Sequence, residues 1–292
     1  MPFDFNIQPD WCDLTVPDHL DFDVHFNDTR VRDKKYVINS DTDEAIAIIG
    51  RGATARNHAE FYNRVWDTIV EDLSQEDLRD KTYKFSSARS KGWSMLDVTF
   101  PNVKTTVETK KHKTEIAFRM IAVHAIDGTA SPATWFGGID TFCTNGQITG
   151  DWDMVRKKNT SGFTVDNFMR ELRVAKTNFD LQGKRLQSWA DTNLYKVKVD
   201  EVIKGIVKSE RKAAKLYDLF LDERHTRGNN KFALYSAFTN YSSYADDRNG
   251  FALRNTGNDT KAVSMLAREQ EVSKWISTPL WTSLEHLREY AA

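Results

Sequence analysis

The chain has 292 residues, 40% apolar and 28% charged, which suits one large or two ordinary domains with a well-hydrated surface. Two cysteines, Cys12 and Cys143, are too few for a disulfide framework, and neither stands beside a His or in a CxxC pair, which disfavours zinc. No window approaches the roughly 18 apolar residues of a membrane span and the first residues do not resemble a signal peptide, so we expect a soluble intracellular protein with no membrane partner.

The formal net charge of −1 conceals an uneven distribution along the chain. Residues 1–80 carry 18 acidic and 8 basic side chains, whereas residues 81–215 carry 24 basic and 14 acidic ones. A basic middle beside an acidic start fits a nucleic-acid surface with an acidic partner or self-masking segment. It fits equally well charge complementarity within the chain or between subunits.

Residues 1–35 alternate acidic and apolar side chains and contain Pro2, Pro9 and Pro17, which disfavour a helix. This pattern predicts an extended acidic arm that packs through its aromatic residues or binds a partner. We expect residues 36–292 to form one α+β domain, rich in sheet over residues 36–150 and helical over residues 151–292.

The sheet-rich part begins with two short apolar runs, residues 36–38 and 45–49, which predict a β-hairpin. A helix is expected over residues 58–73, because apolar residues recur every four positions and Asn57 and Glu60 have the spacing of a capping box. Ser74 caps a short turn after it. Residues 83–109 then alternate with the period of strands.

Residues 114–126 are apolar at both even and odd positions, which indicates a central strand covered on both faces. Arg119 is the exception, and it needs a partner or an exit to solvent. Asp127 and Gly128 predict a type I′ turn, and the chain returns in a second strand from Trp135. The result is an antiparallel β-meander with helices packed on it.

The second half of the chain is mainly helical in pattern. Apolar periodicity predicts helices over residues 165–190, 198–224 and 231–245, each with one apolar face, and a last one over residues 261–289 that Pro279 interrupts. A polar loop rich in Asn and Gly separates the last two.

No catalytic constellation emerges from the sequence. The seven histidines form neither HxxxH nor HExxH, and no GxSxG is present. His124 and Asp127 are close enough for an acid–base pair, but a strand end followed by a turn explains them better, and Cys143 fits a buried strand residue. We therefore predict no catalytic residue, metal or cofactor.

For the basic middle of the chain, we expect contacts with nucleic acid. The candidate phosphate-binding residues are Arg89, Lys91, Lys110, Lys111, Lys113, Arg119, Arg156, Lys157, Lys158, Lys204, Lys208, Arg211 and Lys212. Trp93, Trp135 and Phe136 are the candidates for stacking on bases. The alternative is that the 110–113 cluster is a solvated loop and that Lys204 to Lys212 are a solvated helix face.

Residues 114–150 resemble a family of phage- and plasmid-borne proteins filed as a domain of unknown function. The likeness rests on the strand TEIAFR, on Asp127-Gly128 and on the segment Cys143-Thr144-Asn145-Gly146, and residues 233–239 resemble the family's aromatic helix. Two residues separate His124 from Asp127, and the family's Arg-His pair is absent near residues 156–158, which are departures from its pattern. The resemblance implies a viral or mobile-element setting, and we expect the protein in the cytoplasm of an infected bacterial host.

The order helix, three-stranded meander, helix is similar to the core of RecT/Erf-type single-strand annealing proteins. That likeness implies a homo-oligomer that holds single-stranded DNA in a basic groove during viral replication or recombination. The alternative function is a phage early protein that binds and inhibits a host defence protein through residues 1–35. A nuclease is disfavoured because no carboxylate cluster is present.

Overall fold

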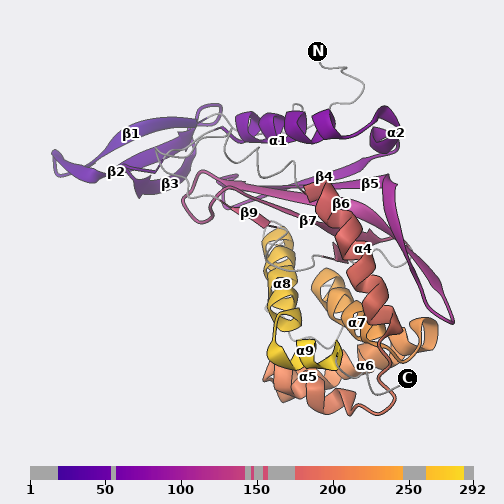
Figure 1. Cartoon of the computed structure of the whole chain (residues 1–292). Coiled ribbons are helices and arrows are strands. Elements are labelled where there is room, and N and C mark those ends of the chain that lie inside the picture. Colours follow the sequence, from indigo (N-terminus) through magenta and orange to yellow (C-terminus); the bar gives the residue numbers. More distant parts are fainter. Residues whose placement is uncertain are drawn as a thin grey trace.

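The computed structural model describes residues 19–53, 57–141, 146–147, 154–156, 175–245 and 261–285. The fold is α+β, as predicted, with the strands in the first half of the chain (Figure 1). The strands are β1 (His19–Phe26), β2 (Thr29–Asn39), β3 (Ala45–Gly50), β4 (Thr82–Ala88), β5 (Trp93–Glu108), β6 (Lys113–Ala125), β7 (Ala133–Asp140), β8 (Gly146–Gln147) and β9 (Met154–Arg156). The helices are α1 (His58–Asp72), α2 (Gln75–Leu78), α4 (Ala175–Asp191), α5 (Val199–Val207), α6 (Glu210–Arg227), α7 (Lys231–Tyr244), α8 (Lys261–Ile276) and α9 (Pro279–Ser283).

Strands β1, β2 and β3 form a small antiparallel sheet in that order. The predicted hairpin over residues 36–49 is confirmed as β2 and β3. Residues 19–35 also belong to this sheet, where we expected an extended arm. Asn27 and Asp28 join β1 to β2 with φ of 46° and 58°, the backbone of a type I′ turn, which Asn and Asp tolerate.

The large sheet has the order β4-β5-β6-β7-β8, with β9 beside β7, and all its pairings are antiparallel. The predicted meander is therefore confirmed. Strand β5 is irregular between Phe100 and Lys104, which pair with the adjacent residues Phe118 and Ala117 of β6. Pro101 lies in this bulge, where its missing N–H interrupts no ladder hydrogen bond.

The central position of β6 is confirmed, with both faces covered. Phe118 and Met120 belong to the main core with α1 and α4, and Ile121 and Val123 pack with Trp135 in a second cluster reached by α8. The predicted type I′ turn after β6 is wrong. Seven residues separate the end of β6 from the start of β7, and in this loop only Gly128 has a positive φ, of 74°.

Helix α1 begins and ends close to the predicted bounds, but its predicted capping box is absent. Asn57 has extended backbone angles and makes no side-chain cap hydrogen bond. The capping box is found one helix later, where Ser74 accepts from the backbone N–H of Asp77 and the Asp77 carboxylate accepts from that of Ser74. Ser74 therefore caps α2, as expected.

The helix predicted over residues 198–224 is two helices. Lys208 adopts a left-handed conformation with φ of 56°, which ends α5. Ser209 then begins α6, because its side chain accepts from the backbone N–H of Lys212. The apolar stripe continues across the break in both helices, so periodicity alone could not reveal it.

Helix α7 is buried on nearly every side, and the prediction of one apolar face is wrong for it. Helices α4, α6 and α8 pack around it, and Phe238 and Tyr241 contact Trp275. The predicted interruption at Pro279 is confirmed. This proline starts α9 after Thr278, whose side chain caps the helix.

Helix α4 covers the edge of β5 beyond the part that pairs with β4. The Gln187 side chain accepts from the backbone N–H of Glu108 at 2.8 Å and donates to its carbonyl at 2.9 Å, which imitates a neighbouring strand. Gly183 allows the close approach, because a Cβ there would lie 2.3 Å from Oγ1 of Thr105.

One core joins the sheet to the helices, since residues of α1, β5, β6, α4, α6 and α7 belong to the same buried cluster. Figure 1 shows the small sheet at one end of the large one and the β5–β6 hairpin reaching toward α6 at the other. None of the described helices has the length and apolar character needed to cross a membrane.

Candidate nucleic-acid interface

The loop that joins β5 to β6 presents the densest group of basic residues in the described chain. Thr109 folds it tightly: its backbone N–H and its hydroxyl both donate to the carbonyl of His112 at 2.9 Å. The same hydroxyl oxygen accepts from the backbone N–H groups of Lys111 and His112. Lys110 and Lys111 are held exposed at the tip, and exposed Lys113 pairs with Glu108 at 3.1 Å.

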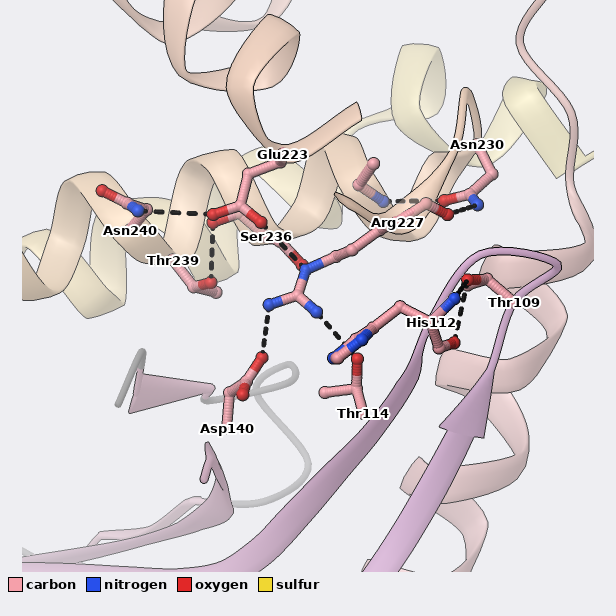
Figure 2. A network of polar contacts seen from close by, with 11 residues as sticks. Thr109, His112, Thr114, Asp140, Glu223, Arg227, Asn230, Ser236, Thr239 and Asn240 are labelled. Atoms are coloured by element: carbon pink, nitrogen blue, oxygen red, sulfur yellow. Dashed lines mark hydrogen bonds and ion pairs between the residues drawn. The ribbon is translucent and has the colours of Figure 1, made fainter. Parts of the chain in front are cut away.

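This tip, residues 109–113, is fixed to the end of α6. The Lys111 ammonium lies 3.5 Å from the backbone oxygen of His225. Beneath it Arg227, buried at the end of α6, donates to Thr114 of β6 at 2.7 Å and pairs with Asp140 of β7 at 2.6 Å (Figure 2). These contacts connect the base of the tip to a helix end and two strands.

The Arg227 network continues into α6 and α7. Glu223 pairs with the Nε of Arg227 at 2.9 Å, and Asn240 donates to Glu223 at 3.3 Å. Asn230 donates to the carbonyl of Arg227 and caps α7 (Figure 2). The sequence could not reveal this network, because Thr114 and Asp140 are about a hundred residues from Arg227 and no local pattern links them.

The other predicted phosphate contacts do not lie beside the tip. Arg89 and Lys91 are in the β4–β5 turn, at the opposite end of β5, whose 16 residues follow a path of about 50 Å. Arg156 pairs in β9 with Ala133 of β7, near that same end. Arg89 and Lys91 therefore do not lie beside the 110–113 cluster.

Lys204, Lys208 and Arg211 are exposed at the corner between α5 and α6. The corner is at the start of α6 and the tip is at its end, about 27 Å apart along an 18-residue helix. Among the described residues, these predicted phosphate contacts thus lie in three separate groups rather than in one continuous groove.

Two of the predicted phosphate contacts are internal. Arg119 is 5% exposed and donates to both carboxylate oxygens of Asp97, at 2.9 and 2.7 Å, and to Glu269 at 2.9 Å. Its need for a partner is confirmed, but no phosphate can reach it. Lys212 is half-buried, pairs with Glu271 at 2.8 Å and lies over the Tyr241 ring.

The predicted stacking residues are also wrong. Trp93, Trp135 and Phe136 are 3%, 7% and 2% exposed and belong to the two core clusters. They lie on β5 and β7, which flank the central strand and are covered on both faces along these residues. No base can stack on their rings in this conformation.

His124 and Asp127 do not form an acid–base pair. His124 is buried under α1, where its Nδ1 lies 2.9 Å from the Nδ1 of His58. The Asp127 carboxylate accepts from the backbone N–H and hydroxyl of Thr129, which orders the loop after β6. Cys143, Asn145, Lys157 and Lys158 lie outside the described residues.

A buried polar cluster surrounds His58 and was not foreseen. Its Nε2 lies 2.9 Å from the Lys91 carbonyl, and its Nδ1 lies 2.7 Å from the Ser94 hydroxyl, which also contacts the Tyr62 hydroxyl at 2.9 Å. Burial lowers the pKa of His58 to about 4, and it raises the pKa of Tyr62 above its ordinary value. The cluster supports the β4–β5 turn from beneath.

Lys231 is a second buried cation that the sequence did not indicate. Its ammonium donates to the Trp281 carbonyl at 2.9 Å and to Glu285 at 2.8 Å, and it lies over the Trp189 and Trp281 rings. Burial lowers its pKa to about 8 against the effect of Glu285. These contacts join α4, α7 and α9 and leave the amine enclosed.

Among the described residues, no group of three or more His, Cys, Asp or Glu side chains is arranged to hold a metal ion. Comparisons with protein-family models, with curated proteins and with solved structures found no match. The two family resemblances stay predictions.

Proposed function

We propose that the protein binds single-stranded DNA and promotes its annealing, with the tip (residues 109–113) contacting backbone phosphates. The observation that supports the proposal most directly is the exposure of Lys110 and Lys111 in a hydrogen-bonded loop beside the end of α6. Neither lysine makes an ion pair with any described residue, so both charges are available to an anion.

The chemistry of the tip suits a phosphate backbone. Lysine ammonium groups bind phosphate as point charges, and each phosphate they neutralise releases a counterion, so such binding weakens steeply with salt. The backbone of the tip is already fixed by Thr109, so little conformational entropy is lost there on binding. Arg224 and His225, in the last turn of α6, add basic character beside it.

The test is a titration of a fluorescent single-stranded oligonucleotide at several salt concentrations between 50 and 200 mM, about the range over which phosphate binding weakens most. The double variant Lys110→Ala/Lys111→Ala should bind more weakly, and the slope of log K against log salt should fall by about one for each phosphate that the variant no longer neutralises. The matched control is Lys204→Ala/Lys208→Ala, which removes the same charge at the α5–α6 corner.

Equal reductions of affinity in the two double variants would assign binding to overall charge rather than to the tip. Absence of single-strand binding by the unaltered protein would reject the proposal. Annealing of complementary strands and the size of the assembly, measured by light scattering, test the homo-oligomer that the proposal includes.

The alternative function is inhibition of a host protein, and exposed Leu20 and Phe22 on β1 favour a protein contact there. It predicts that the protein captures a host partner, that Phe22→Asp abolishes the capture, and that single-stranded DNA is not bound. If Phe22→Asp still captures the host partner, β1 does not form the contact with that partner.

A further inference from the structure

The small sheet has one face open to solvent that carries two rings and several aliphatic side chains. Phe22 of β1 lies directly opposite Tyr36 of β2, which lies opposite Ile48 of β3. Opposed residues of antiparallel strands project from the same face, so these three side chains form one row. Leu20 and Ile38 form the next pair on that face. Leu20 and Phe22 are each 49% exposed, and Ile48 is 57% exposed.

The opposite face of the small sheet is covered by the rest of the protein around Val37 and Ile49. Val37 and Ile49 point there and are buried. Ile49 lies close to Gly128 in the loop after β6, and Ile46 lies against Gly92 of the β4–β5 turn. The small sheet is thus fixed in place, and the row of Phe22, Tyr36 and Ile48 faces away from the core.

Lys34 and Arg32 supply positive charge beside this face, in a small sheet that carries seven acidic and five basic side chains over residues 19–53. Asp21 pairs with Lys35 at 2.7 Å, and Asp23 pairs with both Arg30 and Arg51, so these acidic side chains are neutralised within the sheet. Lys34 precedes Tyr36 by two residues and pairs with Gly50 of β3 as Tyr36 pairs with Ile48, which puts it on the face of the rings. Arg32 lies near it, in the stretch of β2 where the register with β1 shifts. Neither pairs with a carboxylate of the described residues, and both are exposed.

We propose that this face, the row Phe22–Tyr36–Ile48 with Lys34 and Arg32 beside it, stacks the bases of single-stranded nucleic acid. The inference rests on the proposed function and gives it the stacking surface that the buried Trp93, Trp135 and Phe136 cannot provide. The exposed ring of Phe22 next to cations that pair with no carboxylate of the described residues is the combination that such platforms use, because every base has a π-face and every nucleotide a phosphate. An apolar protein partner would leave Lys34 and Arg32 without a counter-charge.

We call the face with Phe22, Tyr36 and Ile48 the platform. The platform and the tip lie at opposite ends of the large sheet (Figure 1). Their separation is set by β5, whose path is about 50 Å long. A short oligonucleotide can occupy one of the two sites, whereas a longer strand can reach both and gain affinity because the second contact is intramolecular. Affinity should therefore rise sharply above the length that spans the two ends.

The decisive variant is Phe22→Leu, which keeps apolar volume and removes the ring. It should weaken binding of a single-stranded oligonucleotide roughly 5- to 100-fold, the range that one base–aromatic stack accounts for, without changing the salt slope. Leu20→Ala is the matched control, because Leu20 is on the same strand and face and is equally exposed but offers no ring. It should bind within about twofold of the unaltered protein, and Phe22→Trp should bind at least as tightly.

A second arm uses an oligonucleotide whose central bases are replaced by abasic sites, so that its phosphates remain. The unaltered protein should discriminate against it, and Phe22→Leu should discriminate less. If Phe22→Leu binds DNA like the unaltered protein, or if it alters only the size of the assembly, the face is a protein contact and the platform is overturned. If the unaltered protein shows steep salt dependence but no preference for bases over abasic sites, the platform fails while the tip stands.

Discussion

The imidazole rings of His58 and His124 meet with their Nδ1 atoms 2.9 Å apart in the interior, between α1 and the large sheet. Only one of the two nitrogens can carry the proton in this contact. Both side chains are fully buried, so a charged ring there lacks the hydration that it has in the unfolded chain.

Stability should therefore fall as the solution is acidified below neutral pH. Burial lowers the pKa of His58 to about 4, whereas the unfolded chain takes up its proton near the ordinary value of 6.5. Between these values the unfolded state binds more protons than the folded state, and the free energy of unfolding should decrease by about 3 kcal/mol in total. Urea unfolding at pH 7, 6 and 5 measures the decrease.

The variant His58→Gln isolates this contribution, since carboxylates elsewhere also titrate on acidification. Gln can still donate to the Lys91 carbonyl, and the pH dependence of its stability should be flatter than that of the unaltered protein. His25→Gln, at an exposed histidine of β1, should leave the dependence unchanged. A slope in His58→Gln as steep as in the unaltered protein would contradict the prediction.

Replacing Arg227 should be among the most destabilising single changes. The variant Arg227→Met leaves the carboxylate of Asp140, which is fully buried, without its cation, and we expect the free energy of unfolding to fall by about 3–5 kcal/mol. Chemical unfolding measures it, and Asp140→Asn in the same background should recover part of the stability. Arg79→Ala breaks an exposed pair with Glu76 and should cost less than about 1 kcal/mol.

Gly183→Ala should destabilise the protein although alanine is the better helix former. The added Cβ would lie 2.3 Å from Oγ1 of Thr105, and the clash should outweigh a gain in helix propensity of about 1 kcal/mol. Thermal unfolding measures the result, and Thr105→Ala should relieve part of it. Gly50→Ala, at a site with open space around it, should change stability little. If Gly183→Ala is more stable than the unaltered protein, α4 lies farther from β5 than in this structure.

Lys208→Gly should stabilise the corner between α5 and α6. Lys208 holds φ at 56°, a conformation that glycine adopts without the clash of a Cβ, and the expected gain is about 1 kcal/mol. Lys204→Gly removes the same charge inside α5 and should instead cost about 1 kcal/mol. The midpoint of urea unfolding measures both changes. Equal effects would contradict the left-handed conformation of Lys208 between α5 and α6.

The regular elements could be predicted because their signals are local. The apolar residues at even and odd positions of residues 114–126 place β6 at the centre of the sheet, and the repeat from Phe61 to Leu73 marks α1. The break at Lys208 was missed because both helices keep their apolar stripe. The enclosure of α7 was missed because it depends on three helices that pack around it.

The candidate site was less predictable, because charge counts do not tell which cations are exposed. Arg119 and Lys212 contribute to the basic middle of the sequence, yet each has a carboxylate partner more than twenty residues away. The lysines of the tip were found because they are adjacent in sequence. Phe22 was attributed to an arm, because its pairing with Tyr36 depends on the turn between β1 and β2.

The double hydrogen bond between Gln187 and the backbone of Glu108 has a consequence for assembly. It occupies the edge of β5 where another molecule could otherwise add a strand. Helix α4 therefore prevents edge-to-edge aggregation of the β5–β6 hairpin. Gln187→Ala would reopen that edge while leaving the hairpin paired with β6. Copies of the protein that come together along a strand of nucleic acid would therefore meet through surfaces other than this edge.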